Sequence, residues 1–207
     1  MNQLKTSADL KLKGRDFITL GIFSVIFIIL FMACIMVMSL TVYTQLFGCA
    51  LGALIAAPVY MLLRAKTPKS GAVVIFGAVY AIVLFAMGSG WPMLVCAIVG
   101  ALIAELIAHT GSYKDYKKET IGYCILMLFI AIASYVPIIA MQETYRELAA
   151  SNGVDADYYQ QIAEVTTVPM LAIALLVTII TALLGTIIAR HMLKKHFVKV
   201  GLIKEVK

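Results

Sequence analysis

The run FITLGIFSVIFIILFMACIMVMSL, residues 17–40, decides the class of this protein. It contains no charged side chain, and a helix needs about 20 mostly apolar residues to cross a bilayer. The rest of the 207-residue chain is similar, with 62% hydrophobic and 14% charged residues and a mean hydropathy of +0.97. Soluble domains are only about 45 to 50% apolar. The sequence therefore predicts an all-α integral membrane protein.

Six segments are long and apolar enough to be predicted as membrane-spanning helices. They make a single membrane domain over residues 1–207. The expected spans are residues 17–40, 43–63, 70–87, 91–109, 121–141 and 168–192. The first run is too long for the apolar part of a cleavable signal peptide, so we expect it to belong to the bundle.

The distribution of Lys and Arg predicts the orientation of these spans. Bases in short connections stay on the cytoplasmic side of a membrane. Of the 17 Lys and Arg residues, all except Arg146 lie before the first span, at or after the end of the last span, or in the second and fourth connections. We therefore expect both termini to be cytoplasmic. The net charge of +6 follows from this topology, and no motif indicates a nucleic-acid partner.

The longest polar segment between two spans is QETYRELAASNGVDADYYQQIAEVTT, residues 142–167, which this topology places outside. Helix-forming residues stop at Asn152 and Gly153, and Asp155 or Asp157 can cap a second helix. We expect an external helical hairpin that closes the bundle. Its five acids and one arginine favour a cationic or metal-chelating solute. The alternative is a solvated loop without a ligand.

Small residues recur every four positions in several spans, as in Gly48, Gly52 and Ala56. Such faces let helices approach closely in lipid. They serve either packing within the bundle or docking of a separate membrane partner.

One ionisable pair lies within a predicted span. Glu105 precedes His109 by four residues, so both side chains share one helix face. The pair indicates either proton coupling or contact with a cytoplasmic partner. The alternative is a carboxylate that snorkels to the membrane interface.

Motifs of enzymes are absent from the sequence. It has no HExxH, GxSxG or GxxxxGK[ST] motif, so we expect no hydrolase or ATPase activity and no cofactor. The four cysteines lack CxxC spacing, and we expect them to be small apolar residues rather than metal ligands. A membrane-embedded enzyme of another kind is the remaining alternative.

The opening KLKGRDFITLGIFSVIF, residues 11–27, resembles the Trep_Strep-type subfamily of S components, the substrate-binding subunits of energy-coupling factor (ECF) transporters. The six-span architecture is similar as well. The resemblance implies capture of a vitamin-like solute or another micronutrient from outside a bacterial inner (cytoplasmic) membrane. It also implies docking on a transmembrane coupling protein that two ATPase subunits drive. The alternative is a self-sufficient secondary carrier or channel for a small solute.

The resemblance places the solute site in the outer half of the bundle, where polar and aromatic side chains are few. The expected substrate contacts are Tyr43, Gln45, Trp91, Tyr135, Gln142, Glu143, Glu164 and Thr167. Their aromatic members are also typical of an interfacial belt, whether or not they bind a solute. For docking, the family commonly uses an AxxxA pattern on the first span. This sequence departs from that pattern, and we assign docking to Gly21 and Ser24.

Overall fold

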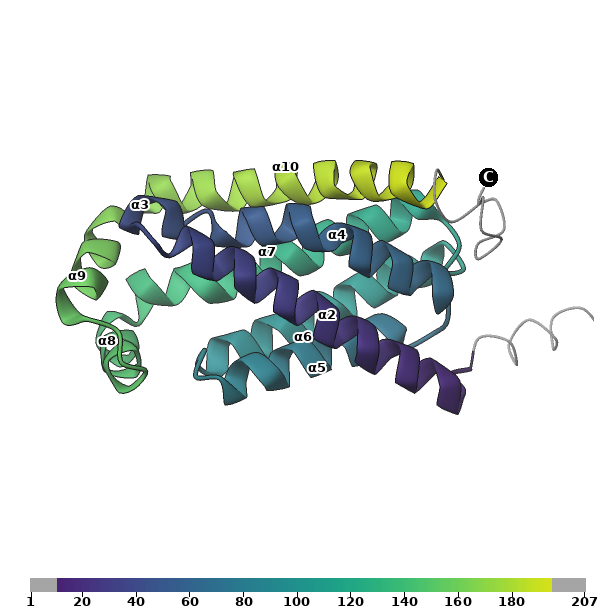
Figure 1. The fold of residues 1–207 in the computed structure, drawn as a ribbon, viewed down its shortest axis with the longest axis horizontal. Helices are drawn as coiled ribbons and strands as arrows, with labels where there is room; N and C mark the ends of the chain where they lie inside the picture. The colour runs from purple at the N-terminus through teal and green to yellow at the C-terminus, as the bar shows by residue number, and fades with distance from the viewer. Residues whose placement is uncertain (1–10, 195–207) are drawn as a thin grey trace, which may run out of the picture.

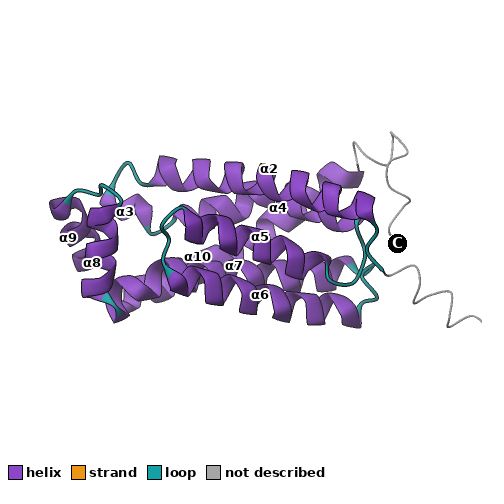
Figure 2. Ribbon diagram, turned by 90° about the horizontal axis from the view of Figure 1, so that it is seen from below, coloured by secondary structure: helices purple, strands orange, loops and turns teal. Residues whose placement is uncertain are grey.

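The structure, a computed structural model, describes residues 11–194 of the chain. These residues form helices joined by short connections, without a β-strand among them (Figure 1 and Figure 2). The elements are α2 (Gly14–Met38), α3 (Val42–Gln45), α4 (Gly48–Lys66), α5 (Ala72–Ala86), α6 (Trp91–Thr110), α7 (Tyr116–Ala140), α8 (Gln142–Ser151), α9 (Ala156–Val165) and α10 (Val168–Met192). The predicted all-α fold is confirmed.

Five helices, α2, α4, α6, α7 and α10, are long and apolar enough to cross a membrane. The helix at the predicted third span, α5, is apolar but has only 15 residues. Gly71 and Gly88 flank it with φ values of 82° and 89°, a backbone conformation that does not continue an α-helix. The span predicted over residues 70–87 is therefore shorter than expected.

Two other predicted boundaries differ from the structure. The span predicted over residues 43–63 is divided, because a separate turn, α3, precedes α4. The Thr41 hydroxyl starts this turn by accepting the Thr44 N–H at 3.3 Å. Helix α7 begins earlier than the predicted residue 121, because Asp115 caps it by accepting the Lys117 N–H at 2.9 Å.

The five long helices and α5 pack side by side as a closed ring in the order α2, α4, α10, α7, α6, α5. Contacts are extensive within the group α2–α4–α10 and within the group α5–α6–α7. They are fewer between the two groups, where α2 meets α5, α4 meets α7 and α7 meets α10. The bundle thus consists of two three-helix groups.

Aromatic rings fill the interface between the two groups. The Phe27 ring meets the Phe76 ring edge-on, with centroids 5.0 Å apart. The Tyr60 ring lies 5.5 Å from Phe76 and 4.9 Å from Tyr123. All four rings are 1% exposed or less, so burial stabilises this contact, and the two contacts of Phe76 add edge-to-face geometry.

Small residues allow the closest approaches between helices of one group. A Cβ atom added to Gly52 of α4 would lie 2.6 Å from the Phe31 ring of α2. One added to Gly185 of α10 would lie 2.7 Å from the Leu54 carbonyl oxygen of α4. Of the two alternatives for the small-residue faces, these contacts show packing within the bundle.

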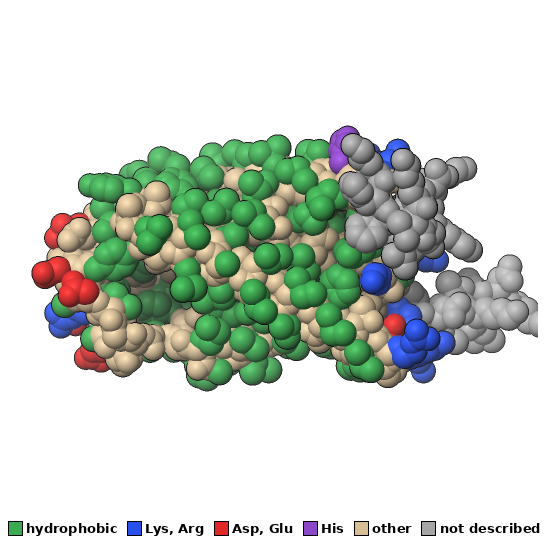
Figure 3. Space-filling model, viewed as in Figure 1, with side chains coloured by type: hydrophobic (Ala, Val, Ile, Leu, Met, Phe, Trp, Pro, Cys, Tyr) green, Lys and Arg blue, Asp and Glu red, His purple; other side chains and the backbone are tan. Residues whose placement is uncertain are grey.

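The two ends of the bundle carry mostly basic and mostly acidic side chains, respectively (Figure 3). The helices alternate in direction, so every described Lys and Arg except Arg146 lies at the end where α2 begins and α10 ends. We call this the basic end. The other end carries α8 and α9, residues 142–167, which we call the cap, with acidic side chains on its surface. The termini that the charge pattern assigns to the cytoplasm lie outside the described residues.

Candidate functional site at the capped end of the bundle

The cap consists of two short helices that lie across the end of the bundle. The chain turns between them at Gly153, which has a φ of 77°. Asp155 begins α9, and its carboxylate accepts a backbone N–H of the first turn at 3.0 Å. Tyr159 and Ile162 form the buried side of α9, with exposed fractions of 6% and 5%. The two helices that the sequence predicts in this segment are thus present.

Tyr158 fastens α9 to the α2–α4–α10 group. Its hydroxyl donates to the Ser39 carbonyl oxygen at 2.7 Å and lies 3.3 Å from the Gln45 side-chain oxygen. Ser39 directly follows α2, and Gln45 ends α3. Helices α3 and α9 also pack against each other, so one side of the cap is held at this point.

Helix α8 is fastened to the other group, at the turn between α5 and α6. Tyr145 donates through its hydroxyl to the Ser89 carbonyl oxygen, and Asn152 donates through Nδ2 to the Gly88 carbonyl oxygen, each at 3.1 Å. Gly88 and Gly90 have φ values of 89° and 79°, which favour glycine. A Cβ atom would lie 2.5 Å from Asn152 at the first position and 2.9 Å from the Tyr145 hydroxyl at the second. The close approach of α8 therefore requires glycine at both positions.

Burial keeps the tyrosines of the cap as hydrogen-bond donors. Tyr159 donates to the Gln142 carbonyl oxygen at 3.2 Å and so ties α9 to α8. Loss of water around its ring raises the pKa of Tyr145 to about 12. The same cause raises the pKa of Tyr158 and of Tyr159 above the ordinary tyrosine value. All three hydroxyls are therefore protonated at neutral pH.

Polar groups of α4 and α7 meet in the interior behind the cap. The Tyr135 hydroxyl accepts the backbone N–H of Cys49 at 2.9 Å, and the Tyr135 side chain is buried. This bond satisfies an N–H at the start of α4 that has no partner within its own helix. The Cys49 thiol lies 3.6 Å from the Ser134 hydroxyl. Figure 3 shows the surface hollowed between the cap and the body of the bundle.

Charged side chains hold the basic end together. Arg64 of α4 donates through Nε and Nη2 to the two carboxylate oxygens of Glu119 of α7, both at 2.8 Å. These side chains are only 2% and 7% exposed. A second pair joins Lys69 and Asp16 at 2.6 Å. The first pair connects the two helix groups, and the second connects the α4–α5 loop to α2.

Glu105 also lies at the basic end, where it caps α5. Its carboxylate accepts the backbone N–H groups of Gly71 at 2.7 Å and Val73 at 3.0 Å. Glu105 is buried, whereas His109 is exposed. The interpretation of Glu105 as a snorkelling carboxylate is therefore wrong. The carboxylate faces inward because a helix N-terminus offers free N–H groups and a favourable dipole.

Residues 14–199 match the model of a family described as hypothetical bacterial integral membrane protein (Trep_Strep). The chain belongs to the Trep_Strep family. No curated protein and no solved structure matches it. The family and the five long apolar helices together establish an integral membrane protein.

In this Trep_Strep protein, some of the predicted substrate contacts gather at the cap. Gln45 lies beside the Tyr158 hydroxyl, Gln142 accepts the Tyr159 bond through its backbone, and Tyr135 lies behind the cap. Tyr43 and Trp91 are 70% and 55% exposed. The positions of these last two are those expected of an interfacial aromatic belt.

The other predicted contacts lie on the surface of the cap. Glu143 pairs with Arg146 at 2.9 Å, and Glu164 accepts a bond from Gln160 at 3.0 Å. Thr167, just before α10, is exposed. Within residues 11–194, no group of three or more His, Cys, Asp or Glu side chains could hold a metal ion. Glu143 and Glu164 thus belong to the exposed face of the cap.

The side chains that fasten the cap to the bundle were not predicted as site residues. They are Tyr145, Asn152 and Tyr158. The available signal was the presence of three tyrosines in one polar segment. A tyrosine combines an apolar ring with one polar atom, so it suits a helix that rests on an apolar bundle.

The two residues assigned to docking lie on different faces of α2. Gly21 is exposed, and a Cβ atom added there would meet no atom within 4 Å. Its neighbours Ile22 and Val25 are more than half exposed. Ser24 is 0% exposed and faces the interior. Gly21 thus lies within the open apolar face of α2.

Proposed function

We propose that this protein is the substrate-binding subunit of an ECF-type importer. It captures a vitamin-like solute or another micronutrient at the capped end and docks on a coupling protein that two ATPase subunits drive. The observation that carries the proposal is the cap, which closes one end of the bundle and is fastened by hydrogen bonds from neutral side chains. Such a bond contributes about 1 kcal/mol, so the cap can open while the bundle stays folded.

In this proposal the basic end faces the cytoplasm and the cap faces outward, as the positive-inside rule expects. Helix α5 is then the sixth span. Its 15 residues rise about 22 Å, so the bilayer thins beside it or the polar connections at its ends lie deeper. Both termini are then cytoplasmic, in the bacterial inner (cytoplasmic) membrane.

The solute site of this proposal lies behind the cap. Tyr135 and Ser134 of α7 meet the start of α4 there, and Gln45 reaches the Tyr158 hydroxyl at its edge. In this proposal the solute enters the hollow between the cap and the body of the bundle (Figure 3), where hydroxyl and amide groups of these residues would bind a small organic solute. The exposed acids of the cap would act on a solute before capture rather than after it.

Retention of the natural solute tests the cap. Mass spectrometry of small molecules carried by the purified protein identifies the solute. The double variant Tyr145→Phe/Tyr158→Phe removes two hydroxyl donors and should release this solute about tenfold faster or more. Ser151→Ala removes an exposed hydroxyl of the cap that bonds only within α8; it is the control and should leave release unchanged. Equal retention by the unchanged protein, the double variant and the control would support the alternative that the cap is a loop without a ligand.

Co-purification tests the assignment to an importer with separate ATPases. The proposal expects a coupling protein and two ATPase subunits to accompany the protein from its native membrane. Gly21→Trp should reduce their recovery, because it fills the open face of α2. Leu176→Trp, on an exposed part of α10, is the control. Accumulation of solute by the protein alone in liposomes under a proton gradient would instead support a self-sufficient carrier.

A further inference from the structure

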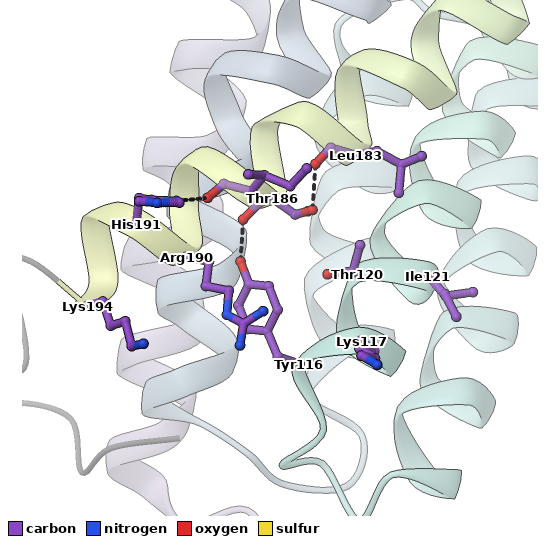
Figure 4. Close-up of a pocket in the computed structure, with 10 residues that line it drawn as sticks. Tyr116, Lys117, Thr120, Ile121, Leu183, Thr186, Arg190, His191 and Lys194 are labelled. Atoms are coloured by element: carbon purple, nitrogen blue, oxygen red, sulfur yellow. Dashed lines mark hydrogen bonds between the residues drawn. The ribbon is translucent and has the colours of Figure 1, made fainter. Parts of the chain in front are cut away.

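A cationic groove lies between α7 and α10 near the basic end (Figure 4). Its cavity has a volume of about 510 Å³. The side chains of Lys117, Arg190, His191 and Lys194 line it, and its described lining includes no acidic residue. The remaining walls are largely apolar and include Ile187. The groove therefore combines a basic mouth with an apolar floor.

Two contacts hold this groove in shape. The Tyr116 hydroxyl donates to the Thr186 carbonyl oxygen and so joins the start of α7 to α10. The guanidinium group of Arg190 lies over the Tyr116 ring, 5.5 Å from its centroid, as Figure 4 shows. Arg190 is thus positioned within the groove by a cation–π contact, while its N–H donors stay available to an anion.

An apolar furrow continues from the groove along the same two helices. It has a volume of about 160 Å³ and is lined by Ile121, Cys124, Ile125, Leu128, Ile179 and Leu183. Ile121 and Leu183 line the groove as well, so the two cavities adjoin. Helices α7 and α10 pack less extensively against each other than each packs against its other neighbour in the ring. This contact between the two helix groups therefore leaves room for an acyl chain.

We propose that the groove and the furrow together bind one anionic phospholipid. Its phosphate lies among Lys117, Arg190 and Lys194 at the basic mouth, and one acyl chain follows the furrow past Ile125 and Leu128. Charge complementarity selects the headgroup, since basic pockets between membrane helices bind anionic headgroups. The furrow selects a lipid over a free anion, because burial of each CH₂ group is favourable. This inference is independent of the proposed transport function.

Binding of a short-chain lipid to the delipidated, full-length protein in detergent tests the proposal. Dioctanoyl phosphatidylglycerol should bind saturably. Dioctanoyl phosphatidylcholine, which has the same chains, should bind at least about tenfold more weakly. Inorganic phosphate should not displace the bound lipid at comparable concentration. Equal affinity for both lipids, or displacement by phosphate, would overturn the proposal.

Two variants locate the site. The triple variant Lys117→Gln/Arg190→Gln/Lys194→Gln should weaken phosphatidylglycerol binding about tenfold or more. The control Arg15→Gln/Lys66→Gln/Lys114→Gln removes the same charge from exposed positions elsewhere at the basic end and should change binding by less than about twofold. An equal loss in the control would show a general attraction to the basic end and contradict the site.

The furrow has its own test, which leaves every charge in place. Ile179→Trp fills the space between α7 and α10 and should weaken phosphatidylglycerol binding, while Leu176→Trp on the exposed face of α10 should not. The single variant Lys194→Gln, at an exposed position, should weaken binding without affecting folding. Unchanged binding in both Ile179→Trp and Lys194→Gln would overturn the proposal.

Discussion

The two ends of the bundle are held together by different kinds of interaction. At the basic end, the buried Arg64–Glu119 pair joins the two helix groups with two bonds of 2.8 Å. At the capped end, Tyr145 and Tyr158 donate to backbone carbonyl oxygens at 3.1 and 2.7 Å. Breaking a buried ion pair costs about 3 to 5 kcal/mol, whereas one neutral hydrogen bond contributes about 1 kcal/mol. The contacts that fasten the cap are thus the weaker of the two sets, and the two helix groups are joined more firmly at the basic end.

The largest expected effect comes from removing one partner of the buried pair. Glu119→Leu leaves the Arg64 guanidinium buried without a carboxylate and should destabilise the protein by roughly 3 to 5 kcal/mol. Denaturant titration of the protein in detergent, followed by circular dichroism, measures this loss. Glu147→Gln changes an exposed acid of α8 and is the control.

A double substitution separates the loss of the ion pair from the burial of one unpaired charge. Arg64→Leu combined with Glu119→Leu removes both charges and should recover most of the lost stability, because an apolar pair of similar volume is often as stable as a buried ion pair. If the double variant were as unstable as Glu119→Leu alone, packing rather than the unpaired charge would explain the loss.

The next effect concerns the start of α5. Glu105→Ala removes the acceptor of two backbone N–H groups and should cost about 1 to 3 kcal/mol. Hydrogen exchange of the amides at Gly71 and Val73 should accelerate. Glu105→Gln retains one carbonyl acceptor and should show a smaller change. Unaltered exchange at both amides in Glu105→Ala would contradict the capping role.

Smaller and local changes are expected at the cap. Tyr158→Phe should accelerate hydrogen exchange in α9 about fivefold, the equivalent of one hydrogen bond. Tyr145→Phe should do the same in α8, and neither should alter exchange around Arg64. Tyr43→Phe is the control. Faster exchange at the basic end in either variant would show that the two ends are coupled and would contradict their independence.

The smallest effect is that of pH on the cap. The pKa of Tyr145 is raised to about 12, above its value in an unfolded chain. The contribution of this tyrosine to stability is therefore fully present below the unfolded-state pKa of about 10 and is lost as the pH rises through the folded-state value. Hydrogen exchange in α8, corrected for its intrinsic pH dependence, should be constant between about pH 6 and pH 9. A loss of protection within that range would contradict a role for the tyrosine donors.

Local sequence signals predicted the helices of this protein better than the contacts between them. The apolar runs and the alternation of bases predicted the long helices and the basic end, and Asp155, one of the two predicted caps, begins α9. These signals depend on residues close together in the chain. The length of α5 was overestimated, because Gly71 and Gly88 bound the helix within an otherwise apolar segment.

The roles of Arg64, Glu105 and Glu119 could not be predicted in this way. Arg64 was counted among the loop bases that set the orientation, yet it is buried against Glu119, whose neighbours in sequence include two lysines. Glu105 caps a helix from another part of the chain. Each role depends on which helices are adjacent in space, and no residue pattern within one helix specifies its neighbour.

The anchors of the cap share one chemical property on the acceptor side. Tyr145, Asn152 and Tyr158 all donate to main-chain oxygens, those of Ser89, Gly88 and Ser39. A main-chain oxygen is present whatever side chain the residue carries, so substitution of Ser39 or Ser89 leaves the acceptor in place. Apart from Gly88 and Gly90, where the close approach of α8 requires glycine, the connections that receive the cap are therefore constrained in shape rather than in side-chain chemistry, and their sequence can diverge while the cap stays bound.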